Sequence, residues 1–101
     1  MYLTGINYIN RTAESHILIG DKSCWGKGYG AEALTEILKF AFNELGLNRV
    51  EARINSDNAA SISLHKKIGY RQDGMLRQAL YKSGHFKDVI VMSILKEELI
   101  E

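Results

Sequence analysis

Residues 16–45, HILIGDKSCWGKGYGAEALTEILKFAFNEL, decide the fold class of this chain. The apolar run at 16–20 has the length of a buried strand and is too short for a buried helix. A glycine-rich loop at 21–30 follows it. Apolar residues then recur three or four positions apart, the spacing of one helix face, at Leu34, Ile37, Leu38, Ala41 and Leu45. The stretch therefore predicts a strand, a glycine loop and an amphipathic helix over residues 31–45.

Four more strands and a second helix are predicted around this unit. The second helix has Asp57 or Asn58 as its N-terminal cap and Gly69 as its stop. The strands are runs that are apolar or alternate apolar with polar residues, namely 4–10 (TGINYIN), 49–55 (RVEARIN) and two strands within 70–95. The turns fall at 11–14, at Gly46, and at Ser83 with Gly84. The order β-β-α-β-α-β-β predicts an α/β, or layered α+β, domain over residues 1–101 with a mixed, mostly antiparallel sheet.

Composition excludes several classes of protein. The 101 residues make one small domain, and 46% hydrophobic with 25% charged residues argues against disorder. The net charge of +1 disfavours nucleic acid or an anionic membrane as the main partner, because both require a concentrated basic surface. Cys24 is the only cysteine, so no internal disulfide forms, and no apolar stretch reaches the ~20 residues of a membrane span. The N-terminus does not resemble a signal peptide, and we expect a cytoplasmic protein.

The glycine loop is the most informative candidate site. Gly26, Gly28 and Gly30 let a ligand approach the backbone at the start of a helix, where unpaired N–H groups attract anions, and Lys27 adds positive charge. The pattern favours a phosphate or pyrophosphate, although glycines also make plain tight turns. Residues 26–31 match the dinucleotide fingerprint G-x-G-x-x-[G/A] as well, with Glu51 about 20 residues on. That alternative is weak, because Glu51 lies near the start of its strand and the chain lacks room for a second nucleotide half.

Two motifs in combination point to a family. WGKGYG followed by EAL at 25–34, and N-x-x-S-x-x-x-[HY]-x-K-x-G-[FY] at 58–70, resemble the GNAT superfamily of acetyl-CoA-dependent N-acetyltransferases. The resemblance is to the branch that acetylates ribosomal protein N-termini, and to relatives that act on amino sugars and polyamines. It covers nearly the whole chain, with Trp25 standing where the family loop usually has Gln or Arg.

The resemblance implies direct transfer of an acetyl group from acetyl-CoA to a primary amine, without a metal. The pantetheine arm would pair with the backbone of one strand, and the pyrophosphate would bind the amides of the glycine loop. Near the start of the second helix the family contacts coenzyme A with an asparagine and a small polar residue. The implied binding residues are Ile17, Leu18, Ile19, Trp25, Gly26, Lys27, Gly28, Tyr29, Gly30, Asn58 and Ser61.

His65 and Glu51 are the implied catalytic residues. His65 stands where many family members carry the tyrosine that protonates the departing thiolate, and Glu51 where some keep a base that acts through water. Each has a plainer interpretation, His65 as a helix-boundary residue and Glu51 as a solvent-facing strand residue. Asn58 likewise suits a helix cap. His16 and His85 have no distinctive spacing, and Cys24 is interpreted as a loop thiol.

The resemblance also implies that a strand, two helices and another strand usually precede the segment that starts here. Two classes of function therefore stay open. One is an acetyltransferase whose acceptor site comes from further residues or another subunit, and the other is a non-catalytic domain that binds acyl-CoA or only self-associates. Because two helices leave apolar surface and a sheet edge to cover, we expect a homodimer.

Overall fold

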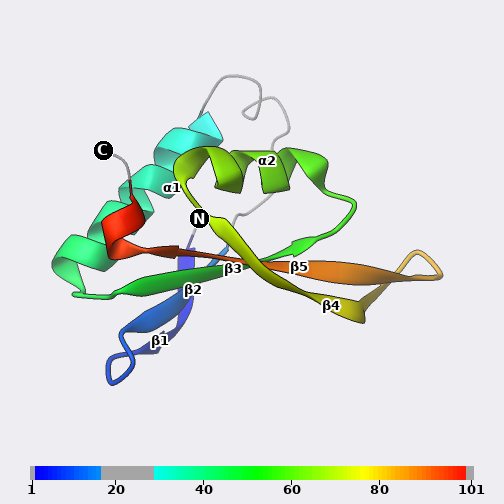
Figure 1. Cartoon of the computed structure of the whole chain (residues 1–101), viewed down its shortest axis with the longest axis horizontal. Coiled ribbons are helices and arrows are strands. Elements are labelled where there is room, and N and C mark those ends of the chain that lie inside the picture. Colours follow the sequence, from blue (N-terminus) through cyan, green and yellow to red (C-terminus); the bar gives the residue numbers. More distant parts are fainter. Residues whose placement is uncertain (1, 17–28, 100–101) are drawn as a thin grey trace.

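The computed structural model describes residues 2–16 and 29–99, which form a five-stranded sheet with its helices on one side (Figure 1). The order along the chain is β-β-α-β-α-β-β, as predicted. The elements are β1 (Tyr2–Asn7), β2 (Thr12–His16), α1 (Tyr29–Lys39) with the π-helical turn η2 (Phe40–Glu44), β3 (Arg49–Asn55), α2 (Ala59–Ile68), β4 (Arg71–Lys82), β5 (His85–Leu95) and the 3-10 turn η3 (Lys96–Glu98).

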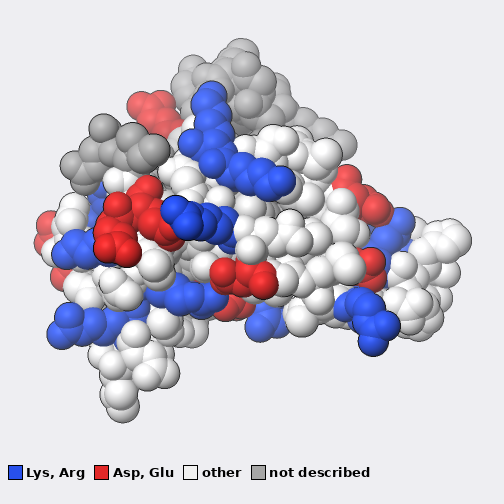
Figure 2. Space-filling view, in the orientation of Figure 1, with Lys and Arg blue, Asp and Glu red and all other residues white. Residues whose placement is uncertain are grey.

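The sheet is mixed, with strand order β1-β2-β3-β5-β4. Among the strands of the described ranges, only β2 and β3 run parallel, and the other neighbouring pairs are antiparallel. This confirms the predicted fold class. Lys and Arg side chains are interspersed with Asp and Glu side chains over the face of the molecule shown in Figure 2.

The core lies between the sheet and the helices. Val50, Ala52 and Ile54 alternate along β3 and are buried, whereas Arg53 between them is exposed. The three pair across the ladder with Ile94, Met92 and Ile90 of β5, so six apolar side chains share one face. Leu34, Leu38 and Phe42 cover them from α1 and η2. Burial of each such large side chain contributes roughly 1.5–3 kcal/mol.

The N-terminal hairpin differs from the prediction. The turn occupies residues 8–11 and not 11–14, because β1 ends at Asn7 and β2 already begins at Thr12. The Asn7 side chain accepts hydrogen bonds from the backbone N–H groups of Ile9 (3.0 Å) and Asn10 (2.9 Å), which bends the chain. Ile9, placed in a strand by the sequence pattern, is 94% exposed. The predicted strand at 16–20 beyond His16 and the loop at 21–28 lie outside the described residues.

The other predicted turns are confirmed. Gly46 follows the first helix with a φ of +68°, and Gly69 ends α2 with its N–H donating to the carbonyls of His65 and Lys66. Ser83 and Gly84 both have positive φ, +54° and +79°, which matches the two-residue turn that suits the twist of a hairpin. The first helix begins at Tyr29 rather than residue 31, and its last turn is π-helical, with Leu45 N–H donating to the Phe40 carbonyl.

One feature of the sheet positions the candidate site. The parallel pairing of β2 with β3 runs only from Thr12 opposite Arg49 to Glu14 opposite Glu51. Beyond this point β3 continues to Asn55, paired with β5 on its other side. Among the described residues, no strand pairs with the β2-facing edge of residues 52–55. We call this stretch the open edge of β3.

Candidate active site

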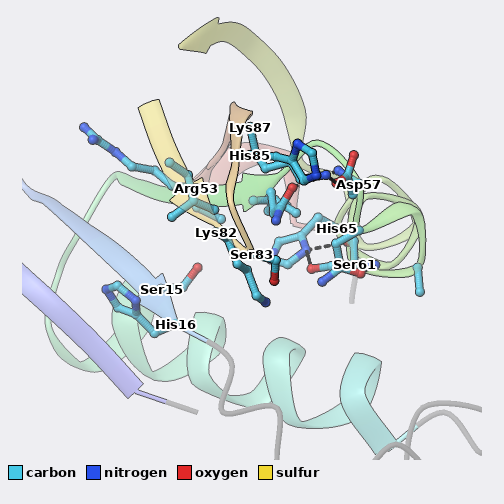
Figure 3. A pocket seen from close by; sticks show the side chains of 16 residues that line it. Ser15, His16, Arg53, Asp57, Ser61, His65, Lys82, Ser83, His85 and Lys87 are labelled. Atoms are coloured by element: carbon cyan, nitrogen blue, oxygen red, sulfur yellow. Dashed lines mark hydrogen bonds and ion pairs between the residues drawn. The ribbon is translucent and has the colours of Figure 1, made fainter. Parts of the chain in front are cut away.

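A cavity of about 1010 Å³ opens where β2 and β3 separate (Figure 3). Its walls come from four parts of the chain: the end of β2, the open edge of β3, the first turns of α2, and the hairpin between β4 and β5. The lining residues are Ser15, His16, Ala52, Arg53, Ile54, Asn55, Asp57, Asn58, Ala60, Ser61, His65, Leu80, Lys82, Ser83, His85 and Lys87.

Side chains from both faces of the sheet reach this cavity. Along a strand, successive side chains point to opposite faces. Ser15 and Ala52 are buried on the helix-covered face, so His16 and Arg53, which follow them, belong to the opposite face. The cavity therefore occupies the gap between the two strands. Ser15 and Ala52 line it from the helix-covered face of the sheet, and His16 and Arg53 line it from the opposite face.

His65 is the buried titratable group on the helix side. It is only 2% exposed, and its Nδ1–H donates to the Ser61 carbonyl at 2.7 Å. In a neutral imidazole this leaves Nε2 without a proton. Among residues 2–16 and 29–99 no hydrogen-bond partner of Nε2 is found, and His65 is one of the residues that line the cavity. Burial lowers the pKa of His65, and the bond to Ser61 offsets this only in part.

Tyr70 and Ser15 hold the wall behind His65. The Tyr70 ring meets the imidazole edge to face, with ring centroids 4.7 Å apart, and its hydroxyl lies 2.9 Å from Ser15 Oγ. Burial raises the pKa of Tyr70 far above its usual range, which the bond to Ser15 counteracts only weakly, so the phenol stays protonated. The sequence analysis missed both residues as site components. Tyr70 is the last position of the quoted family motif, whereas nothing in the sequence distinguishes Ser15.

Asn58 and Ser61 lie together at the first turn of α2. Asn58 is the N-cap, and its side chain accepts from the backbone N–H of Ser61 at 3.1 Å. The capping interpretation of Asn58 is therefore confirmed. Both residues also line the cavity. Contact with coenzyme A stays a prediction for each.

Glu51 lies apart from this group, on the opposite face of β3 and outside the cavity lining. Its two carboxylate oxygens accept from Arg49 Nη1 at 3.0 Å and Arg53 Nε at 3.1 Å. Partial burial alone would raise the pKa of Glu51, but the bonds and charges of both arginines outweigh it and hold the pKa below its ordinary value. Its role as a base stays a prediction, and these ion pairs make it a weak proton acceptor.

The glycine loop can be described only at its end. Tyr29 and Gly30 are the first two residues of α1, so their backbone N–H groups belong to the helix turn that has no internal acceptors. Such a turn attracts anions. The other predicted loop and strand contacts, Ile17, Leu18, Ile19, Trp25, Gly26, Lys27 and Gly28, lie outside the described residues.

Two further findings concern residues 2–16 and 29–99. Within these ranges, no group of three or more His, Cys, Asp or Glu side chains is arranged to hold a metal ion. None of the helices described there is long and apolar enough to cross a membrane.

The architecture is thus an α/β domain with a cleft between two parallel strands that separate. The acetyltransferase (GNAT) domain model matches residues 3–71, and the chain belongs to this family. This confirms the resemblance that the two sequence motifs indicate.

Several named proteins are similar to the chain. It is 36% identical over 74 residues to an uncharacterized N-acetyltransferase, p20, of Bacillus licheniformis, covering 73% of this chain and 42% of that protein. It is 34% identical over 96 residues to the putative ribosomal N-acetyltransferase YdaF of Bacillus subtilis, covering 95% of this chain and 52% of the relative. The chain therefore spans about half the length of such relatives.

A solved structure extends the similarity to the fold. The spermidine N-acetyltransferase of Vibrio cholerae in complex with CoA and spermine matches with a TM-score of 0.88 and 29% identity. The match covers 95% of this chain and 56% of that one.

Proposed function

We propose that the chain provides the acetyl-donor site of an acetyl-CoA-dependent N-acetyltransferase that acts on primary amines. The observation that carries the proposal is the cavity at the separation of β2 and β3, because it joins the open edge of β3, unpaired among the described residues, to a buried imidazole. Family membership and a structural neighbour solved with CoA support it.

The open edge of β3 fits an extended arm that carries amide groups. Its backbone N–H and C=O groups can pair with such an arm as an added strand would. By the family resemblance, the arm is pantetheine, Ile17, Leu18 and Ile19 supply the facing backbone, and the amides of residues 25–30 bind the pyrophosphate. Asn58 and Ser61 lie beside the same cavity and complete the proposed contacts.

His65 is the proposed carrier of the proton that reaches the leaving sulfur. When the amine attacks the thioester carbonyl, the C–N bond forms and the nitrogen of the tetrahedral adduct still carries a proton in excess. The unprotonated Nε2 of His65 takes that proton and passes it to sulfur as the C–S bond breaks. Burial favours this second transfer, because it makes the imidazolium a stronger acid.

The proposal also covers the acceptor amine, the cellular location and the oligomeric state. Two relatives are named for spermidine and one for ribosomal acetylation, which supports small or peptide amines as the acceptor class. We also propose a cytoplasmic homodimer, with no nucleic acid or membrane partner. The resemblance also implies a water-assisted base at Glu51, which stays a prediction, and its bonds to Arg49 and Arg53 weigh against that role.

Calorimetry with coenzyme A, followed by an acetyl-transfer assay with a panel of primary amines, tests the function. Saturable binding with transfer supports the acetyltransferase. Binding without transfer to any amine would favour the alternative, a non-catalytic acyl-CoA-binding domain. Absence of both would refute the assignment of the cavity.

A further inference from the structure

His16 is a second histidine in the cavity, on the side opposite His65. It is the last described residue of β2, and its Nε2 lies 2.6 Å from Thr4 Oγ1 and 3.7 Å from Glu14 Oε1. The Tyr2 ring stacks on the imidazole at 4.8 Å between centroids, with only 10° between the ring planes. Residues of β1 and β2 therefore fix the orientation of this ring.

The neighbours of Nε2 favour one tautomer of neutral His16. The Thr4 hydroxyl can either donate or accept, whereas the Glu14 carboxylate, 3.7 Å from Nε2, can only accept. The carboxylate therefore favours a proton on Nε2, donated to Thr4 Oγ1. In this tautomer Nδ1 carries the free electron pair.

The position of His16 complements that of His65. The two side chains come from opposite faces of the gap between β2 and β3, and both line the cavity. An acetyl group held in the gap would thus have one imidazole on each side. The attacking amine needs a proton acceptor on its own side, since a primary ammonium of pKa ~10 must lose a proton before it can attack.

We propose that His16 is the general base of the amine, with Glu14 and Thr4 as its positioning residues; this rests on the proposed acetyltransferase function. Nδ1 takes one proton from the substrate ammonium, which leaves a neutral amine. The amine attacks the thioester, the C–N bond forms and the C–S bond breaks. The second nitrogen proton reaches sulfur through His65, and the first returns to solvent from His16.

Other charged groups near the cavity suit this role less well. Glu51 is held by two arginines. Lys87 pairs with Asp57 at 2.6 Å, and the Arg53 guanidinium bonds Glu51. Lys82 extends from the hairpin toward the cavity in Figure 3, but no hydrogen bond or ion pair among the described residues holds its side chain in one position. His85, on the same hairpin, has no side-chain hydrogen bond or ion pair among the described residues that would fix its tautomer.

The kinetic test compares His16→Gln with Lys96→Gln, a change at an exposed residue outside the cavity lining, in the complete chain and across pH. At about pH 7 we expect His16→Gln to lower kcat/KM by ~10²-fold or more, the scale of a lost general base, and Lys96→Gln to change it less than about twofold. Toward about pH 9.5 the deficit of His16→Gln should shrink, because solvent then deprotonates the amine. A deficit that is small, or equal at both pH values, would overturn the proposal.

A second measurement does not depend on turnover. Nitrogen-15 NMR of the imidazole of His16 should show the proton on Nε2, and Glu14→Gln together with Thr4→Val should redistribute it toward Nδ1. A proton on Nδ1 in the wild-type protein would overturn the proposal whatever the activity. Coenzyme A binding by His16→Gln should equal that of wild type. If neither protein binds coenzyme A, the proposed acetyltransferase function is refuted, and the failure does not lie with His16.

Discussion

The Tyr70 hydroxyl and Ser15 Oγ lie 2.9 Å apart, and this buried bond joins the end of β2 to the residue just after α2. The Ser15 side chain also reaches the carbonyl of Glu51 at 3.4 Å, at the last parallel pair before β2 and β3 separate. The bond therefore stabilises the point at which the sheet opens and the wall on which His65 packs.

Tyr70→Phe tests how much this hydrogen bond contributes to the stability of the fold. The change removes one partner and leaves the buried Ser15 hydroxyl with a single long contact, so we expect the free energy of unfolding to fall by about 1–3 kcal/mol. Urea unfolding with an unchanged m-value measures it. Tyr81→Phe is the matched control, because Tyr81 is 65% exposed and should lose less than about 0.5 kcal/mol. Equal losses in both variants would contradict the prediction.

Stability should also depend on pH through His65. Burial lowers its pKa below the ordinary 6.5, so between that lowered pKa and 6.5 the unfolded chain binds more protons than the folded one. The contribution is complete above 6.5 and is lost as the pH falls through the folded pKa. His65→Gln should flatten the fall in the free energy of unfolding between about pH 7 and about pH 5.5.

Asp73 and Glu51, two carboxylates with lowered pKa values, affect the free energy of unfolding at lower pH than His65 does. The Ser93 hydrogen bond and Arg49 lower the pKa of Asp73, and the arginines lower that of Glu51, from ordinary values of 3.8 and 4.5. Their contributions are therefore lost only below those values. Identical pH dependence in wild type and His65→Gln would show that His65 is not the group responsible.

Local patterns in the sequence were sufficient for most of the fold. The alternation of Val50, Ala52 and Ile54 and the glycines at 46, 69 and 84 act through nearest neighbours, and their elements are confirmed. The N-terminal turn was misplaced because one side chain, Asn7, ends β1 by bonding two backbone N–H groups, which competes with the apolar character of Ile9.

The site was predictable only where a residue belongs to a motif. His65 and Ser61 lie in α2, Asn58 is its N-cap, and all three line one cavity. The Ser15–Tyr70 bond joins residues 55 positions apart, and the His16–Thr4 bond depends on the register of a hairpin. Neither bond can be inferred from the spacing of residues along the sequence, because contacts of this kind depend on how the strands pair.

Gly28→Val tests the proposed pyrophosphate site. A β-branched side chain would stand where the phosphates must approach the backbone at the start of α1, so coenzyme A affinity should fall at least ~10-fold. Calorimetry measures it, with Lys27→Ala as a milder companion that removes charge and leaves the backbone path open. Unchanged coenzyme A affinity in Gly28→Val would refute the pyrophosphate site.

We expect no appreciable NAD(H) binding, and saturation at micromolar NAD(H) would restore the dinucleotide alternative.

His65→Phe tests the proton carrier. Phenylalanine keeps the aromatic bulk against Tyr70 but cannot transfer a proton, so kcat should fall by ~10²–10⁴-fold while coenzyme A affinity holds. Steady-state kinetics and calorimetry on the same preparation separate the two effects. A kcat within about twofold of wild type would make His65 a structural residue and solvent water the acid.

Self-association should occur through β4, the last strand of the described sheet beyond β5. The outer edge of this 12-residue strand offers unpaired backbone groups, and Met75 and Leu76 on it are 48% and 39% exposed. Proteins seldom leave such an edge uncovered, and a second copy can pair with it across a two-fold axis. We therefore expect a dimer at micromolar concentration by sedimentation or light scattering.

Leu76→Lys should shift this dimer toward monomer, because lysine on an edge strand opposes pairing between copies. Tyr8→Lys is the control, since Tyr8 is 64% exposed but follows β1 at the opposite edge of the sheet. Dissociation by Tyr8→Lys alone would move the interface to β1. A wild-type chain that folds cooperatively and sediments as a monomer would refute the dimer, and would mean that this sheet keeps its β4 edge in water without a partner.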